Sequence, residues 1–106
     1  GKPDAFVCSN DPSAAVFCKT LEKAGLSVPK DVLLTGFADM PIAALISPPL
    51  TTIRQERDQL GGRAFKRLLE RIANPTLPAN EIFFPAPLVA RESTVRRRKD
   101  KGGRKK

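Results

Sequence analysis

The order of apolar and polar residues in the first 37 positions constrains the fold more than any other feature. The run AFVC at 5–8 predicts a short strand, and Ser9 to Pro12 after it suit a strand end, a helix cap and a first helical turn. An amphipathic helix is predicted from about residue 12 to 24, and we expect Gly25 to end it in the left-handed conformation. VLLTGF at 32–37 predicts a second strand, buried on both faces. Two strands joined by a helix through short links lie parallel in a right-handed crossover, so the chain is predicted to be of the α/β class.

The carboxyl ends of the two predicted strands fall at one edge of the sheet, and open α/β sheets bind ligands at that edge. Asn10 and Asp11 follow the first strand, and Ala38 and Asp39 follow the second. An amide and a carboxylate can hold the hydroxyl or amide groups of a small polar molecule. We therefore predict ligand contacts for Asn10, Asp39 and Asp11. The alternative for Asn10 and Asp11 is that they cap the helix, and the sequence leaves it open.

Residues 40–46 predict one or two helical turns that carry more small apolar residues than a short surface helix needs. An intermolecular contact would explain the excess, and packing against the preceding helix would explain it equally well. Pro48 and Pro49 prevent the helix from continuing, and Thr51 to Ile53 suit an extended exit. We interpret 50–56 as a connection that leaves the first lobe.

DQLGGRAFKRLLERIA at 58–73 is the clearest predicted helix, and Asn74 and Pro75 end it. Its apolar face is predicted to comprise Leu60, Ala64, Phe65, Leu68, Leu69, Ile72 and Ala73, with the charged residues, Arg67 and Arg71 among them, facing solvent. Residues 82–84 and 88–91 read as extended pieces interrupted by prolines, which favours a crossover or an edge strand.

The formal charge of +8 first suggests a nucleic-acid binder, but most of it lies in residues 96–106, RRRKDKGGRKK. That tail has nothing apolar to bury, so we predict it to be disordered and its nucleic-acid contacts to be nonspecific. The sequence has no histidine, which removes the commonest general base and metal ligand, and we predict no enzyme activity, no metal site and no cofactor. Cys8 and Cys18 are predicted to be buried thiols. The short chain and the absence of an initiator Met suggest a piece of a longer protein.

Four segments in this order carry a resemblance: SNDP with the following helix and DVLLTGFADMP, then PPLTTIRQ, then LGGRAFKRLLERI, then PAPLVARESTVRR. Together they resemble the C-terminal portion of the effector-sensing domain of lactose-repressor and galactose-repressor (LacI/GalR) family transcription regulators. The resemblance covers about residues 3 to 96.

The resemblance implies part of a two-lobe, periplasmic-binding-protein-like type I fold: a βαβ parallel-sheet unit, a helix of the second lobe and a returning strand. Residues 1–95 would belong to the sensor domain, with 1–53 and 85–95 in the C-terminal lobe and 57–75 in the N-terminal lobe, and 96–106 would form the tail. Two of the family's three crossovers would lie at 84–87 and at a hinge of Ile53, Arg54, Gln55 and Glu56.

The family's site residues carry over only in part. Its effector-binding Asn matches Asn10, but its acid after the Gly-aromatic pair is replaced here by Ala38, with Asp39 one position later. The family dimerises through this lobe, which would place Ala15, Cys18, Lys19, Ile42, Leu45 and Ile46 at the dimer interface.

The function implied is the ligand-sensing and dimerisation part of a cytoplasmic repressor. It would respond to a sugar-like or nucleobase-like effector, form a homodimer and bind operator DNA through a helix-turn-helix that this chain does not contain. The sequence leaves two alternatives: a sugar-binding protein of an ABC transporter, and a small basic nucleic-acid-associated protein.

Overall fold

The computed structural model describes residues 2–96 of the 106-residue chain, and the predicted basic tail lies almost wholly outside them. The described chain divides into two compact units. Unit 1 comprises residues 2–54 and 88–96, and unit 2 comprises residues 55–87. No helix within residues 2–96 has the length and apolar character needed to cross a membrane.

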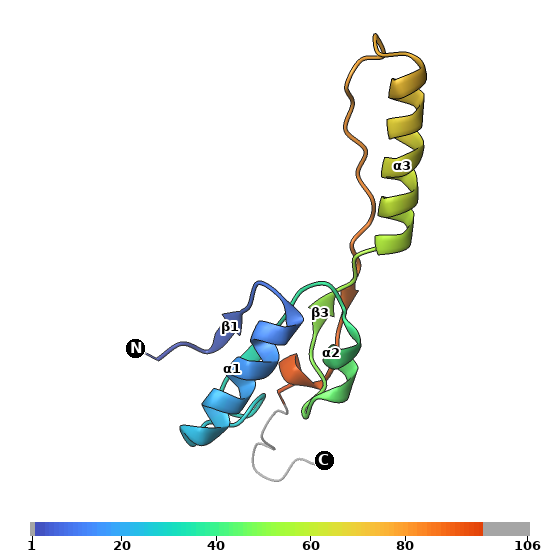
Figure 1. The fold of residues 1–106 in the computed structure, drawn as a ribbon. Coiled ribbons are helices and arrows are strands. Elements are labelled where there is room, and N and C mark those ends of the chain that lie inside the picture. The colour runs from blue at the N-terminus through green and yellow to red at the C-terminus, as the bar shows by residue number, and fades with distance from the viewer. Residues whose placement is uncertain (1, 97–106) are drawn as a thin grey trace, which may run out of the picture. The chain divides into compact units, whose positions relative to one another are not determined.

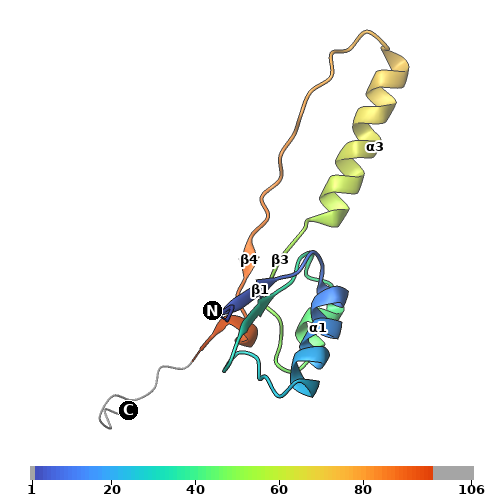
Figure 2. The ribbon, with the colours of Figure 1, turned by 90° about the vertical axis from the view of Figure 1, so that its left-hand side faces the viewer.

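Unit 1 contains the predicted strand, helix and strand: β1 (Ala5–Val7), α1 (Asp11–Lys23) and β2 (Leu33–Thr35). β1 and β2 pair in parallel, with Ala5 opposite Leu33 and Val7 opposite Thr35, which confirms the predicted βαβ arrangement. α1 lies beside this pair of strands (Figures 1 and 2). Gly25 has φ 85 and so adopts the left-handed conformation predicted for it.

The core of unit 1 lies between α1, the strands and the segment after β2. Its buried residues are Ala14, Cys18, Leu21, Val28, Val32, Leu34, Ala43 and Leu50. Phe6 and Phe17 pack edge to face at the margin of this cluster, with ring centroids 4.7 Å apart. α1 runs one residue less far than predicted: it ends at Lys23, and Ala24 is its exposed C-cap.

The second strand is shorter than predicted, because β2 ends at Thr35, and Phe37 is exposed. The chain beyond β2 nevertheless keeps pairing: Gly36 N–H donates to Thr51 O (2.9 Å), and Ala38 N–H donates to Ile53 O (2.8 Å). Residues 51–54 therefore run parallel to residues 35–38. Gly36 is required at this contact, since a Cβ there would collide with the side chains of Asp11 and Leu50.

Two short elements complete the strand region. β3 (Thr52–Ile53) pairs antiparallel with β4 (Leu88–Val89), so both connections to unit 2 start from one strand pair. Within residues 40–46 the predicted short helix is present as α2 (Pro41–Leu45), and a 3-10 helix, η1 (Glu92–Thr94), follows β4. Only Leu88–Val89 of the predicted extended piece 88–91 is a strand, and residues 82–84 form none.

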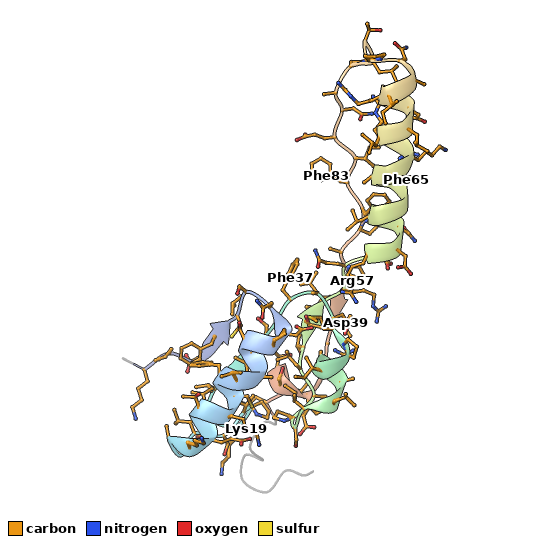
Figure 3. The ribbon with its side chains drawn as sticks, viewed as in Figure 1. Lys19, Phe37, Asp39, Arg57, Phe65 and Phe83 are labelled. Carbon is orange, nitrogen blue, oxygen red and sulfur yellow. The ribbon has the colours of Figure 1, made fainter. Side chains whose placement is uncertain are left out.

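Unit 2 consists of α3 (Arg57–Ala73) and the extended return that runs alongside it (Figures 1 and 2). The predicted apolar face exists as a pattern, but none of α3's residues is buried, and Phe65 is 62% exposed. Phe83 on the return is exposed as well (Figure 3). Arg67 and Arg71 were predicted to face solvent and are instead half-buried; the Arg67 guanidinium donates to Glu70 and to the carbonyl of Pro78 (2.6 Å).

Candidate functional site

The carboxyl ends of β1 and β2 open at one edge of unit 1, as parallel pairing requires. The loops that follow them carry the three predicted ligand residues, Asn10, Asp11 and Asp39. The segment that becomes β3 runs beside the second loop and adds Thr52 and Arg54 to the same region. The candidate site is therefore built from three stretches of chain.

Asn10 is the N-cap of α1, and its Oδ1 accepts the backbone N–H of Ser13 at 2.8 Å. The capping role that the sequence left open is thus present. The residue is exposed, and the cap occupies only its oxygen, so the two amide N–H donors remain available to a small molecule. Effector contact by Asn10 stays a prediction.

Asp11 is fully buried in the first turn of α1. Its Oδ2 accepts the N–H of Met40 at 2.7 Å, and its Oδ1 accepts the hydroxyl of Thr52 at 2.7 Å. Both oxygens serve the protein itself, and the side chain presents no surface to a solute in this conformation. The predicted effector contact of Asp11 is untested.

The loop between β2 and α2 has an unusual backbone, since Ala38 (φ 108) and Asp39 (φ 56) both have positive φ. Such angles are uncommon for residues other than glycine and persist where the surroundings impose them. Here Met40 is held by Asp11, and the N–H of Asp39 donates to the Thr52 hydroxyl oxygen at 3.3 Å. The buried carboxylate and the buried hydroxyl together fix the path of this loop.

The carboxylate of Asp39 lies between two arginines, at the end of unit 1 opposite Lys19 in Figure 3. Arg91 Nη2 donates to Oδ1 at 2.9 Å, and Arg54 Nε donates to Oδ2 at 3.0 Å. Burial by itself raises the pKa of Asp39, but the hydrogen bonds and positive charges of Arg91 and Arg54 outweigh it and hold the pKa below its ordinary value. Asp39 is thus an ion-paired carboxylate at neutral pH.

A set of buried hydroxyls beside this ion pair was not foreseen from the sequence. Ser93 Oγ donates to Leu34 O (2.6 Å) and accepts the N–H of Thr51 (2.8 Å), and the N–H of Arg91 donates to Thr51 Oγ1 (2.7 Å). These bonds join η1 to β2 and to the start of β3. No local pattern marks such residues, because their partners lie about 40 or more positions away in the chain.

The residues predicted for a dimer interface are scattered over α1 and α2. Cys18 lies in the core, so its side chain is not available to a partner in this conformation. Lys19 is exposed and 3.8 Å from Glu22, Leu45 is 79% exposed, and Ala15, Ile42 and Ile46 are half-buried. The interface itself is untested.

The predicted hinge, Ile53 to Glu56, spans the boundary between the two units, which falls after Arg54. Ile53 is in β3, Arg54 belongs to the ion pair, and Gln55 and Glu56 begin unit 2. The chain returns to unit 1 at Leu88, directly after the second predicted crossover. Movement at either place stays a prediction.

Among residues 2–96, no group of three or more acidic, cysteine or histidine side chains is placed to hold a metal ion. Cys18 is a buried thiol as predicted, whereas Cys8 is only half-buried; burial raises the pKa of both free thiols. Burial and a raised pKa make a thiol a weak nucleophile.

Comparison with protein families finds one model, described as a periplasmic binding protein-like domain, that matches residues 1–94. Among curated proteins, the transcriptional regulator MalR of Streptomyces coelicolor is 41% identical over 91 residues, covering 86% of this chain and 26% of the regulator. The ribose operon repressor of Escherichia coli is 37% identical over 92 residues, covering 87% of this chain and 28% of the repressor. The chain therefore spans about a quarter of the length of these relatives.

Solved structures of transcription regulators also match most of this chain. The lac repressor dimer bound to operator and the anti-inducer ONPF matches with a TM-score of 0.80 and 31% identity, over 88% of this chain and 28% of that one. A LacI family regulator from Enterococcus faecium with bound ribose matches with a TM-score of 0.80 and 32% identity, over 92% of this chain and 36% of that one.

Proposed function

This chain belongs to the periplasmic binding protein-like domain family and, within it, to the LacI-type transcription regulators, and from that premise we propose that it is part of the effector-sensing domain of a repressor. Unit 1 corresponds to the C-terminal lobe and α3 to a helix of the N-terminal lobe. The remainder of the sensor and the DNA-binding head would belong to the complete protein. The curated relatives named above are regulators of transcription rather than enzymes, which supports binding without catalysis.

One observation carries this proposal: the edge where β1 and β2 end lies beside the place where the chain leaves and re-enters unit 1. Asn10 presents its amide donors at that edge, and Arg54 and Arg91 bind the adjacent loop through Asp39. A small molecule held at the edge would therefore act next to both connections between the lobes. That placement suits a domain that converts binding into a change of lobe orientation.

The mechanism we propose is a shift between two lobe orientations. An effector that binds one orientation more tightly favours it, and in a homodimer the spacing of the two DNA-binding heads changes with it. Couplings of this kind are typically about 1–3 kcal/mol, or roughly 5- to 150-fold in affinity. The exposed parts of α1 and α2, including Lys19 and Leu45, would supply the dimer contact, and the protein would act in the cytoplasm.

The effector we propose is a small sugar-like or nucleobase-like molecule. Regulators of similar structure were solved with ribose and with cellobiose, which supports a sugar. A sugar-binding protein of a transporter is the weaker candidate, because the curated relatives named above are regulators of transcription.

The test is an electrophoretic mobility-shift assay with the complete gene product and the DNA upstream of its own gene. We expect sequence-selective binding whose affinity changes at least about fivefold with one of a panel of sugars and nucleobases. A matched variant, Asn10→Ala, should need more effector for the same change, whereas Ser9→Ala should behave as wild type. Absence of sequence-selective DNA binding by the complete protein would overturn the proposal.

A further inference from the structure

Asp39 joins two stretches of chain that lie far apart in the sequence and both lead to unit 2. Arg54 directly follows β3 and is the last residue of unit 1 before the chain leaves it. Arg91 lies two residues after β4, the strand on which the chain returns. β3 and β4 pair with each other, and the two arginines lie just beyond the ends of these strands. By bonding to both arginines, Asp39 bridges the two connecting strands.

Both oxygens of the Asp39 carboxylate take part in the bridge. Each oxygen accepts from a different arginine, at 2.9 Å from Arg91 and 3.0 Å from Arg54. The Asp39 side chain is 13% exposed and that of Arg91 20%, whereas Arg54 is 49% exposed. Charge-assisted hydrogen bonds are about twice as strong as neutral ones, and shielding from water preserves more of that strength. The hydrogen bond from Arg91 is therefore the stronger of the two, and the hydrogen bond from Arg54 is the weaker and breaks more easily.

Further hydrogen bonds hold the Asp39 loop and Arg91 in position. Thr52, on β3 itself, accepts the N–H of Asp39, and buried Asp11 accepts the N–H of the next residue, Met40. Arg91 is fixed as well, because its Nη1 donates to Leu50 O at 3.0 Å. The positive φ angles at Ala38 and Asp39 are thus part of an arrangement that holds both partners in place.

We infer that Asp39 is a positioning residue that clamps the two connecting strands together, rather than a group that binds the effector. This rests on the proposed function, in which those strands lead to the moving lobe. An effector that displaced the loop at 38–40 would alter the bridge to β3 and β4 at once. Asn10, an exposed residue whose cap bond uses only its oxygen, remains a polar side chain of this edge that is open to an effector.

After Phe37 the chain has Ala38 where the family has an acid, and the acid Asp39 stands one position later. With Ala38 in place of the acid, the acid one position later could have taken over effector binding. In this chain each of its oxygens already accepts from an arginine, and the side chain is only 13% exposed, so little of the carboxylate is accessible to an effector hydroxyl. The displaced acid therefore serves the connecting strands.

The test is amide hydrogen exchange on the complete gene product, with no effector or DNA present. Asp39→Asn keeps the shape of the side chain but removes its charge, and should raise the exchange rates of the β3 and β4 amides about tenfold while those of β1 change less than about twofold. Arg54→Gln should raise the β3 rates, and should add nothing once Asp39 is replaced. Asp4→Asn, which neutralises an exposed acid of the same unit, is the matched control and should change neither pair of strands.

Unchanged exchange in β3 and β4, or an equal increase across all of unit 1, would overturn the clamp. The double variant guards against a general loss of stability, because independent effects would add. The exchange experiment contains neither effector nor DNA, so it tests the clamp alone, whereas the mobility-shift assay tests the sensing function. Either proposal can therefore be overturned while the other is supported.

Discussion

The hydroxyl of Thr52 donates a hydrogen bond to Oδ1 of Asp11 at 2.7 Å, across 41 positions of the sequence, and neither side chain is exposed to solvent. The same hydroxyl oxygen accepts the N–H of Asp39, so one side chain on β3 supports both the start of α1 and the loop after β2. A buried carboxylate is costly unless its oxygens are hydrogen-bonded. The stability of unit 1 should therefore depend on this hydroxyl.

Thr52→Val tests that dependence, because valine has nearly the same shape and lacks the hydroxyl. Loss of the bond leaves a buried carboxylate oxygen without its partner and should lower the free energy of unfolding by about 1–3 kcal/mol. Urea denaturation of the complete gene product measures the change. Thr52→Ser keeps the hydroxyl and is the control. Equal stability of the valine and serine variants would show that the hydrogen bond contributes little.

Gly36 should tolerate no side chain, for a reason that its backbone angles do not reveal. A Cβ would collide with Asp11 Oδ1 and come within 2.7 Å of Leu50 Cδ2, and both atoms belong to buried side chains that cannot move freely. Overpacking of this kind typically costs about 1–3 kcal/mol. We expect Gly36→Ala to lower the urea midpoint and Gly36→Val to lower it further. A wild-type midpoint for Gly36→Ala would mean that the contact relaxes without cost.

The sequence was sufficient to predict the βαβ unit because its signals are local. A polar stretch with a proline opens α1, Gly25 closes it, and apolar runs of the right length flank it. The edge at which Asn10 and Asp39 lie followed directly from that topology. The sequence also indicated the ends of α3 and the short helix at 41–45.

The contacts within the site could not be predicted in the same way. The partners of Asp39 depend on the pairing of β3 with β4, and those strands are only two residues long, too short for alternation of apolar and polar residues to mark them. The buried hydroxyl of Ser93 depends on the same pairing. The apolar face of α3 was predicted as a pattern, but a pattern does not say whether a partner within the chain covers it, and here Phe65 and Ile72 stay exposed.

Leu45→Glu tests the proposed dimer contact on α2. Leu45 is 79% exposed, so its replacement should leave the fold of unit 1 intact, whereas a carboxylate buried against a partner subunit would be costly. We expect the complete gene product to shift from dimer to monomer, or to need at least about tenfold more protein to dimerise, in sedimentation velocity experiments. Lys30→Glu, at an exposed position between α1 and β2 and outside both helices, is the control. An unchanged dimer in the Leu45 variant would place the interface elsewhere.

The ion pairs of Asp39 should give its contribution to stability a defined pH dependence. Arg91 and Arg54 hold its pKa below the ordinary value of 3.8 in the folded protein, so folding favours the ionised form. The stabilisation is therefore fully present above about pH 4 and is lost as the pH falls through the lower, folded pKa. In urea denaturation of the complete gene product, the stability difference between wild type and Asp39→Asn should stay constant from about pH 7 to 5 and shrink below about pH 4. A difference that shrinks already near about pH 6, or grows on acidification, would contradict an ion-paired Asp39.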